Sequence, residues 1–392
     1  MADQETTIPK GWKMMTLGEV ADVNNSTIDR YYSFDEIEYI DVASVEERKL
    51  TQTQKLKLEN APSRAKRIVI DNSVLISTVR PNLKHYCFIK KAKPNLIAST
   101  GFAVVNSKEE KSDPYFLYNL LTTSDYTNFL IKVADSQTST YPAFNPSIIQ
   151  NSKFAFPSYP EQRAIAAVLS SLDDKIELLR EQNKTLEATA QTIFKEWFVN
   201  FNFPGATGKM IDSELGEIPE RWRVGKFGDT FKIDYGRSDK KFEKDGDFPV
   251  YGAGGIVGYS RSTDYQGYQV IVGCRGTCGN ITLAHEDSKI THNSLIITNE
   301  WFKPYIYLFL QIIDIKRAIT GSTQPQITIG DLGNIQIYIP EDRLIKLFSE
   351  NINSAFEKIK NNNSQIQTLS RLRDTLLPKL MKGEVRVKEF ND

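Results

Sequence analysis

Cysteine is scarce in this chain, since its 392 residues include only Cys87, Cys274 and Cys278. An odd, widely spaced set offers no disulfide framework, so we expect a protein of the reducing cytoplasm. Long uncharged apolar runs and a signal-peptide pattern are also missing from the sequence. We therefore expect neither membrane insertion nor a membrane partner.

The chain also lacks an excess of one charge. Its 49 lysines and arginines balance 49 aspartates and glutamates. This balance argues against a generally basic surface for nucleic acid, although local patches remain possible. The length and a hydrophobic content of 40% suggest two or three domains.

Motifs for independent catalysis are missing as well. The glycines of residues 252–258 do not form Gly-x-Gly-x-x-Gly, and residues 113–116 (Asp-Pro-Tyr-Phe) lack the second proline of the Asp-Pro-Pro-Tyr motif of amino-methyltransferases. A zinc site is not expected, because the spacing of the candidate ligands misses the finger pattern. Those candidates are Cys274, Cys278, His285 and His292.

Two long heptad patterns are present. Apolar residues recur at alternating steps of four and three over residues 165–197, where Asn183 fills one seam position. The same spacing returns over residues 348–380, interrupted by Asn362 and Arg373. Such spacing predicts two long helices that each pack against a partner as a coiled coil.

The chain also repeats itself. An Ile-Pro-x-x-Trp opening occurs at residues 8–12 and 218–222, and a Ser-Thr-x-Pro segment occurs at 139–142 and 322–325. From there each copy runs into its heptad helix without a change of spacing. The predicted order is globular part, helix, globular part, helix.

Each globular part has a mixed pattern. One helix per copy is predicted to begin at Asp113-Pro114 and at Lys303-Pro304, with proline in the first turn. Short apolar runs between turn residues predict strands at 67–70, 74–77, 102–105, 269–272 and 295–298.

This order of features resembles the DNA specificity subunit of Type I restriction-modification systems over almost the whole chain. The resemblance includes residues 195–201 (KEWFVNF) and 376–380 (LLPKL), which close the two long helices. It implies an α+β fold with two repeated mixed α/β target recognition domains, separated by two long helices packed as an antiparallel coiled coil. The implied domains are target recognition domains at 1–160 and 204–340, spacer helices at 161–203 and 341–382, and a tail at 383–392.

The resemblance also implies a function. The chain would be a non-catalytic, sequence-specific subunit that reads a bipartite double-stranded DNA target with one domain per half-site. Because the two copies differ in sequence, the target should be asymmetric. Partners would be methyltransferase subunits, two of them, which bind S-adenosylmethionine, and restriction or translocase subunits, which bind ATP and Mg; this chain would bind no cofactor.

Two other classes of function stay open. A stand-alone DNA methyltransferase or nuclease would need a phosphate-binding glycine loop, a metal-binding carboxylate set or a Pro-Pro-Tyr motif, and the sequence has none that we can identify. A coiled-coil adaptor would use its globular parts to bind protein. DNA retention with and without a methyltransferase partner distinguishes these hypotheses.

Basic residues in the first copy suggest a DNA contact. Between residues 64 and 93 Asp71 is the only acid, and a solvated loop without a ligand is the alternative. The predicted phosphate and base contacts are Arg64, Lys66, Arg80, Asn82, Lys84, His85 and Tyr86.

In the second copy, the glycine-rich residues 273–279 permit a close backbone approach to DNA. The alternative is a tight hairpin with an exposed arginine. The predicted contacts are Tyr235, Arg237, Lys240, Lys241, Arg275 and Thr277.

Two predictions concern the long helices. The aromatic residues Phe194, Phe198 and Phe201 are expected to dock methyltransferase subunits, unless they pack on the second globular part. Polar seam residues favour facing one another in an antiparallel pair. The predicted register joins Asn183 with Asn362, Trp197 with Phe348, and Arg373 with Asp173 or Asp174.

Overall fold

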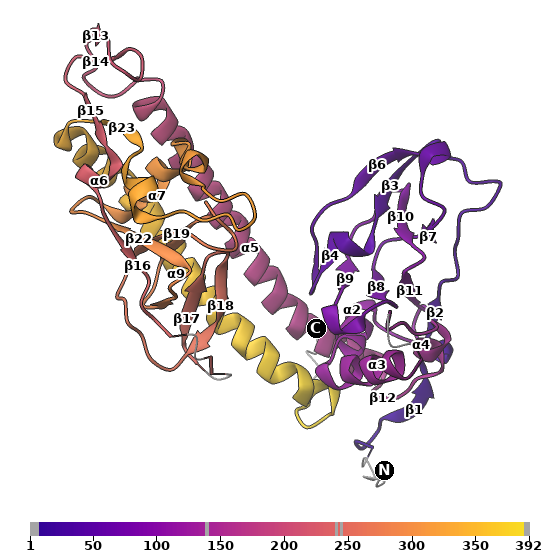
Figure 1. Ribbon diagram of the computed structural model, residues 1–392. Coiled ribbons are helices and arrows are strands. Elements are labelled where there is room, and N and C mark those ends of the chain that lie inside the picture. Colours follow the sequence, from indigo (N-terminus) through magenta and orange to yellow (C-terminus); the bar gives the residue numbers. More distant parts are fainter. Residues whose placement is uncertain (1–7, 138–140, 240–241, 244–245, 388–392) are drawn as a thin grey trace. The chain divides into compact units, whose positions relative to one another are not determined.

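The computed structural model describes residues 8–137, 141–239, 242–243 and 246–387 (Figure 1). The chain forms two compact units: unit 1 contains residues 1–176 and 367–392, and unit 2 contains residues 177–366. The boundary between the units falls inside both long helices, α5 (Tyr159–Phe198) and α9 (Asp342–Met381). Each unit is therefore built from segments that lie far apart in the sequence.

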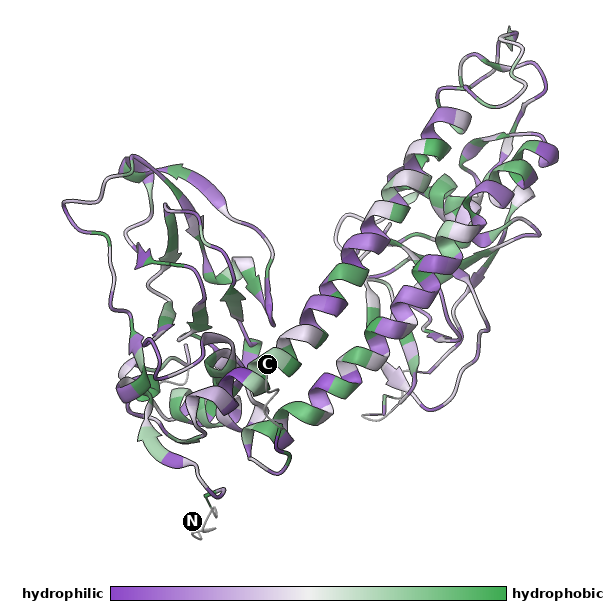
Figure 2. Cartoon of the chain, turned by 180° about the vertical axis from the view of Figure 1, so that it is seen from behind, coloured by the Kyte–Doolittle hydropathy of each residue, from purple (hydrophilic) through white to green (hydrophobic). Residues whose placement is uncertain are grey.

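The first long helix is shorter than predicted, because α5 ends at Phe198 rather than at residue 203. Phe201 adopts a left-handed backbone with φ 60, and Pro204 follows, so the helix cannot continue. Figure 2 shows hydrophobic residues recurring among hydrophilic ones along both long helices, as the heptad spacing predicts.

Unit 1 contains two four-stranded sheets with the orders β6-β3-β10-β7 and β2-β11-β8-β9, and the smaller pairs β1-β12 and β4-β5. The strands are β1 (Lys13–Thr16), β2 (Ala21–Val23), β3 (Glu36–Ile40), β4 (Val45–Glu46), β5 (Lys49–Leu50), β6 (Gln54–Lys57), β7 (Ala65–Ile68), β8 (Ser73–Ser77), β9 (Tyr86–Ile89), β10 (Leu96–Ser99), β11 (Phe102–Ser107) and β12 (Lys153–Phe156). β8 is buried along its whole length, which explains its continuous apolar run.

The predicted first-copy helix begins as expected but is divided. The Asp113 carboxylate accepts hydrogen bonds from the backbone N–H groups of Tyr115 and Phe116, and Pro114 occupies the first turn. The chain leaves helical geometry at Thr122, so two helices replace one. The unit 1 helices before α5 are α1 (Leu17–Val20), α2 (Pro114–Leu121), α3 (Ser124–Gln137) and α4 (Ser147–Asn151).

Unit 2 repeats this plan with sheets ordered β16-β22-β19-β20 and β18-β17-β21, and the pairs β15-β23 and β13-β14. Its strands are β13 (Met210–Ile211), β14 (Ile218–Pro219), β15 (Arg223–Lys226), β16 (Lys232–Tyr235), β17 (Phe248–Gly252), β18 (Gly255–Ser260), β19 (Gln269–Gly273), β20 (Ile281–Ala284), β21 (Lys289–Ile290), β22 (Ser294–Thr298) and β23 (Gln336–Ile339). Its helices before α9 are α6 (Phe227–Thr230), α7 (Lys303–Ile312) and α8 (Ile329–Gly333).

The sequence repeat is therefore a structural repeat. Strands β2, β11, β8 and β9 of unit 1 correspond in order to β16, β22, β19 and β20 of unit 2. Each unit also joins one parallel pair, β3 with β10 and β17 with β21, to an antiparallel neighbour. The predicted strands at 74–77, 102–105, 269–272 and 295–298 are confirmed, whereas β7 ends at Ile68 and leaves residues 69 and 70 outside it.

The core of unit 1 contains the end of α9. Leu380 and Met381 of α9 are buried in one cluster with Trp12, Ile165 and Leu169. The core of unit 2 likewise combines the second half of α5 with the first half of α9. Each of the two long helices therefore contributes apolar residues to the cores of both units.

The helix pair has the predicted register in unit 2. The Asn362 amide, which is fully buried, donates to the Asn183 side-chain oxygen at 2.8 Å. The Trp197 and Phe348 rings meet with centroids 5.5 Å apart. Because rising numbers in α5 meet falling numbers in α9, the pair is antiparallel.

The predicted charged contact lies in unit 1. Arg373 of α9 donates to the Asp173 carboxylate of α5 at 2.8 Å, and Arg48 of the β4-β5 hairpin donates to its other oxygen at 3.0 Å. Tyr115 donates to the same carboxylate at 2.5 Å. Burial by itself raises the pKa of Asp173, but the two arginines and these hydrogen bonds outweigh it and lower the pKa. The three predicted register contacts are confirmed.

Among the described residues, none of the helices has the length and apolar character needed to cross a membrane.

Candidate nucleic-acid interface

An arginine lies at one end of the unit 1 sheets. Beyond β8, the Thr78 N–H donates to Gly101 at 2.8 Å, and the Arg80 N–H donates to the Pro142 carbonyl at 2.7 Å. Val79 forms an antiparallel bridge with Ala143. The chain that follows the first Ser-Thr-x-Pro segment is therefore fixed against the segment that holds Arg80.

The Arg80 side chain is presented to solvent. Its backbone has φ 48, in the left-handed region, and its guanidinium carbon lies 5.0 Å from the centre of the Tyr141 ring. No carboxylate of the described residues forms an ion pair with it within 4.0 Å. An arginine stacked on an aromatic ring keeps its N–H donors available, so Arg80 fits the predicted base or phosphate contact.

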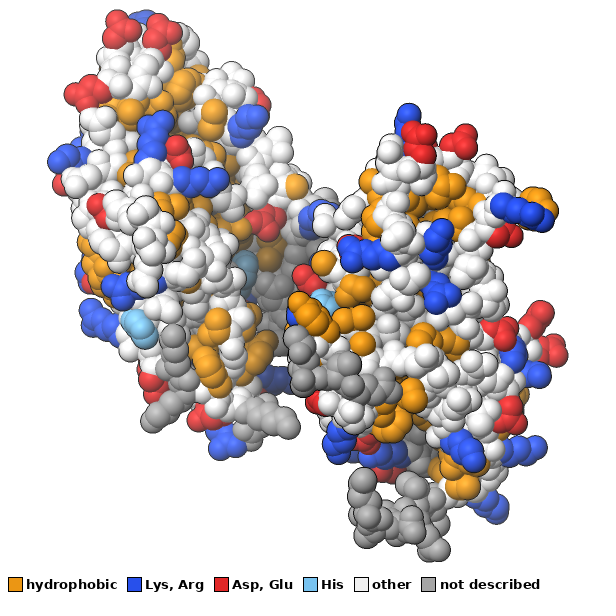
Figure 3. Space-filling model, turned by 45° about the vertical axis from the view of Figure 1, so that its right-hand side comes forward, with side chains coloured by type: hydrophobic (Ala, Val, Ile, Leu, Met, Phe, Trp, Pro, Cys, Tyr) orange, Lys and Arg blue, Asp and Glu red, His pale blue; other side chains and the backbone are white. Residues whose placement is uncertain are grey.

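Most of the other cations predicted as a DNA patch are paired inside unit 1. Arg64 binds Asp41 at 2.5 Å, and Lys84 binds Glu47 at 3.1 Å. Three further lysines between residues 64 and 93 are also paired, namely Lys90 with Asp174, Lys91 with Asp71 and Lys93 with Glu38. Figure 3 shows acidic side chains among the basic ones on the face in view. Acids from distant parts of the sequence therefore offset much of the positive charge between residues 64 and 93, while the predicted DNA contacts there stay a prediction.

Two predicted contacts are structural. Tyr86 is buried on β9, where its hydroxyl donates to Glu47 at 3.1 Å. The His85 Nδ1 contacts the Val45 carbonyl. Both side chains contact the β4-β5 hairpin inside unit 1, which does not fit the prediction that they contact DNA. Lys66 and Asn82, by contrast, are exposed.

The equivalent loop of unit 2 follows β19. Cys274 and Arg275 both donate their N–H groups to the Asn293 carbonyl, at 2.9 and 3.2 Å. Arg275 is exposed, and no carboxylate of the described residues forms an ion pair with it within 4.0 Å. Gly276 has φ 82, and a Cβ on Gly273 would lie 2.3 Å from the Thr277 carbonyl oxygen, so the turn requires glycine.

This loop also contacts its Ser-Thr-x-Pro segment. Arg275 forms an antiparallel bridge with Gln326, as Val79 does with Ala143 in unit 1. The Cys278 thiol donates to the Pro325 carbonyl at 2.9 Å. In the sequence these segments indicate only the repeat, and their position beside both arginines is not predicted from it; their twofold recurrence is the available signal.

The remaining predicted contacts of unit 2 differ in exposure. Arg237 is exposed and lies 3.9 Å from Asp234, and Thr277 is exposed beside Arg275. Tyr235 is half-buried at the end of β16. Lys240 and Lys241 lie outside the described residues.

The residues considered above for a zinc site and for a methyltransferase motif make contacts within the fold. Burial raises the pKa of the Cys274 thiol, and Cys278 bonds to carbonyl groups. The Asp113 carboxylate caps α2, and burial raises its pKa. His285 is enclosed beside the aromatic ring of Tyr268.

The aromatic residues predicted to dock a partner are largely buried. Phe194 and Phe198 are only 1% and 2% exposed and belong to the core of unit 2. Their rings pack on Tyr305 and Phe348, so these two residues belong to the core and do not form an exposed docking surface. Phe201 is partly buried and packs on Trp222.

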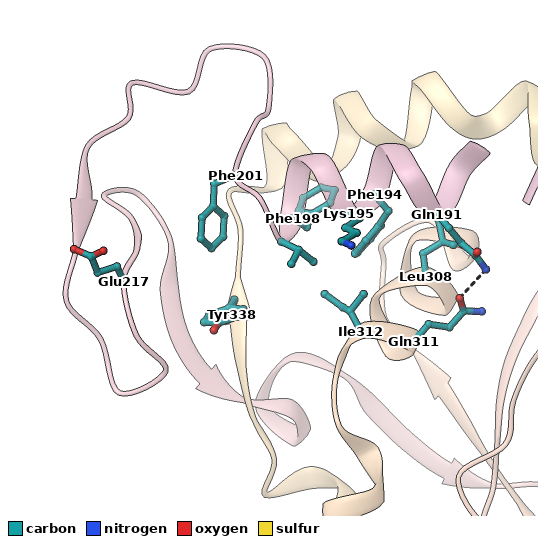
Figure 4. Close-up of a pocket in the computed structure, with 11 residues that line it drawn as sticks. Gln191, Phe194, Lys195, Phe198, Phe201, Glu217, Leu308, Gln311, Ile312 and Tyr338 are labelled. Atoms are coloured by element: carbon teal, nitrogen blue, oxygen red, sulfur yellow. Dashed lines mark hydrogen bonds between the residues drawn. The ribbon is translucent and has the colours of Figure 1, made fainter. Parts of the chain in front are cut away.

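A pocket of about 570 Å³ nevertheless opens beside them (Figure 4). It lies between the end of α5 and α7, with Tyr338 of β23 and Glu217 on another side. Gln191 donates to Gln311 at 3.0 Å across its edge, and Val199 and Ile312 are each about two-fifths exposed. The pocket combines apolar walls with a polar rim.

Unit 1 has a pocket of about 630 Å³ at the corresponding place. It lies between the end of α9, helices α2 and α3, and strand β12. Both pockets are lined by the same positions of the long helix and the residue after it, when each helix is counted from its first residue. These are Asp374, Leu377, Pro378, Met381 and Lys382 at the end of α9, and Gln191, Phe194, Lys195, Phe198 and Val199 at the end of α5. The repeat thus produces one such pocket per unit.

Comparison with known proteins gives a consistent result. Residues 9–188 and 219–368 match the family described as Type I restriction modification DNA specificity domain. The chain is 28% identical to the Type I restriction enzyme MjaIX specificity subunit of Methanocaldococcus jannaschii over 98% of this chain and 95% of that protein. It is 23% identical to the HindI specificity subunit of Haemophilus influenzae over 95% of this chain and 99% of that protein.

The fold has a solved counterpart. The crystal structure of the Type I restriction-modification system S subunit from M. genitalium superposes with a TM-score of 0.58 at 18% identity, covering 94% of this chain and 96% of that one. At this identity the likeness concerns the fold.

Proposed function

The chain belongs to the family of Type I restriction-modification DNA specificity subunits, and from this premise we propose that its two units read the two halves of one bipartite, asymmetric double-stranded DNA target. The observation that supports this division is the arginine loop found once in each unit, beside a Ser-Thr-x-Pro segment. The loops differ in their side chains, which favours different half-sites.

Recognition begins with donors that face solvent. Arg80 and Arg275 each offer a planar guanidinium that can bond two acceptors of guanine in the major groove. The paired lysines and arginines contribute less net charge, so affinity depends on the few cations without a carboxylate partner and on partner subunits. The family is non-catalytic, and chemistry on DNA belongs to those partners.

We propose two methyltransferase subunits as partners, one at each of the repeated pockets. A pocket that occurs once per unit at matching positions suits two copies of the same protein. In the proposed cytoplasmic complex these subunits bind S-adenosylmethionine, and restriction or translocase subunits supply ATP- and Mg-dependent steps. The long helices serve as the spacer between the half-site readers.

The proposal is tested by mapping methylated sites in cells that express the chain with its methyltransferase. Arg80→Ala should relax a base in one half-site and Arg275→Ala a base in the other, each by about 5- to 150-fold in discrimination. Arg64→Ala is the matched control, because that side chain is paired with Asp41 and should leave base identity unchanged.

Several outcomes would contradict the proposal. Relaxation of both half-sites by Arg80→Ala would show that one unit does not read one half-site. Methylation by the chain alone would favour a stand-alone enzyme. A chain that never binds DNA, with or without its methyltransferase, would favour a protein-binding adaptor.

A further inference from the structure

The two Ser-Thr-x-Pro segments differ at a single position. Both contain Ser, Thr and Pro in the same order, whereas the third residue is Tyr141 in the first copy and Gln324 in the second. In both units a bridge joins the residue after the proline to the arginine loop, Ala143 with Val79 and Gln326 with Arg275. A variable residue in a repeated frame is expected where the two units recognise different sequences.

In unit 1 the variable residue contacts the arginine. The Tyr141 ring lies 5.0 Å from the guanidinium carbon of Arg80, and 63% of the tyrosine is exposed. The Arg80 N–H is held by the carbonyl of the next residue, Pro142. The ring therefore restricts the directions in which this arginine can donate.

In unit 2 the variable residue is a polar side chain facing solvent. Gln324 is exposed next to Pro325, whose carbonyl accepts the hydrogen bond from the Cys278 thiol of the Arg275 loop. A glutamine amide can bond the N6 and N7 positions of adenine, as arginine bonds guanine. Gln324, which suits adenine, and Arg275, which suits guanine, therefore lie on neighbouring backbone segments.

We infer that the third residue of each Ser-Thr-x-Pro segment determines specificity: Tyr141 positions Arg80, and Gln324 contacts a base directly beside the base read by Arg275. This inference rests on the proposed division of half-sites between the units. It adds the residues that make each reader differ from the other.

Methylated sites are mapped in cells expressing the chain with its methyltransferase partner. Tyr141→Ala should relax the same base position as Arg80→Ala, by about 5- to 150-fold in discrimination, whereas Tyr141→Phe, which keeps the ring, should retain the wild-type site. Gln324→Ala should relax a position adjacent to that of Arg275 in the other half-site. Ser322→Ala, an exposed neighbour, is the matched control and should retain the wild-type site.

Failure of this inference can be distinguished from failure of the proposed function. If the wild-type chain directs methylation to a bipartite site but Tyr141→Ala and Gln324→Ala leave both half-sites unchanged, this inference is wrong and the proposed function stands. Equal loss of methylation at all sites by a folded variant would also overturn it, because it indicates a general contact. If the wild-type site has one half, or neither arginine variant alters it, the proposed function fails.

Discussion

At the residue scale, His285 is a partly buried residue whose titration has a clear consequence for stability. Burial, with a smaller effect of the Lys360 charge, lowers its pKa to about 4. Its Nδ1 has no hydrogen-bond partner among the described residues. Protonation therefore opposes the folded form of unit 2.

The sign of the pH effect follows from this lowered pKa. Unfolded histidine titrates near 6.5, so the unfolded chain binds the proton first, and stability is lost as pH falls from about 6.5 toward 4. The expected loss is roughly 3 kcal/mol for unit 2. His285→Phe, which keeps a ring beside Tyr268, should remove this dependence in urea unfolding between pH 7 and 4.5.

A matched variant separates His285 from other groups. His292 is exposed, so His292→Gln should retain the wild-type pH dependence. Burial raises the pKa of Glu286, which titrates in the opposite sense, so the difference between wild type and His285→Phe is the informative quantity. An unchanged pH dependence in that variant would contradict the assignment of this effect to His285.

At the same scale, the sequence allowed the exposed arginines to be predicted, but not the ion pairs that offset the charge of the other basic residues. Arg80 and Arg275 were found because glycine, proline and arginine mark tight loops at the ends of apolar strands. Tyr86 was not recognised as buried, because its hydroxyl partner Glu47 lies on a separate hairpin. A count of charges along the sequence cannot include acids that only folding brings near.

At the scale of elements, the buried asparagine pair fixes the register of α5 and α9. The Asn362 amide donates to Asn183, and the Asn183 amide donates to Asn363, each at 2.8 Å. Asn362→Leu should cost about 1–3 kcal/mol, since it leaves the Asn183 oxygen without this donor. Asn361→Leu, at an exposed neighbour, should change stability by less than about 0.5 kcal/mol.

The double variant Asn183→Leu/Asn362→Leu tests the register itself. It should be more stable than either single variant, because both polar groups are removed together, and it should permit alternative registers. Urea unfolding gives the stabilities, and disulfide trapping of cysteines placed at Trp197 and Phe348 reports the register. Additive single effects with no coupling would contradict a direct contact.

The register could be predicted because it depends on a few polar positions in an otherwise apolar seam. The division between α2 and α3 could not be predicted, because residues 115–131 contain no proline or glycine that would end a helix. The Thr122 and Thr123 hydroxyls bond to carbonyls of the preceding turn, which ends α2 locally. Such competition between side chain and backbone leaves only a weak signal in sequence.

At the scale of the whole molecule, the repeated pockets predict the stoichiometry of the complex. Ile312 borders the unit 2 pocket and Phe129 the unit 1 pocket, and both are more than a third exposed. If each pocket holds one methyltransferase subunit, as proposed, Ile312→Glu or Phe129→Glu should each remove one copy, and the double variant should bind none. Native mass spectrometry counts the copies.

Tyr31→Glu is the control, because Tyr31 is 74% exposed and borders neither pocket. A single substitution that releases both copies would indicate a partner that binds only as a preformed dimer. Unchanged stoichiometry in the folded double variant would place the docking surface elsewhere.

The burial of Leu380 and Met381 in the core of unit 1 has a consequence for biosynthesis. Domains of most proteins fold in the order in which the ribosome releases them, at about 5–20 residues per second. Here the first unit lacks part of its core until Leu380 and Met381 are made, so its apolar surface waits roughly 10–40 s beyond residue 176. A stop codon before Leu380 would therefore damage the unit whose first 176 residues are translated earlier.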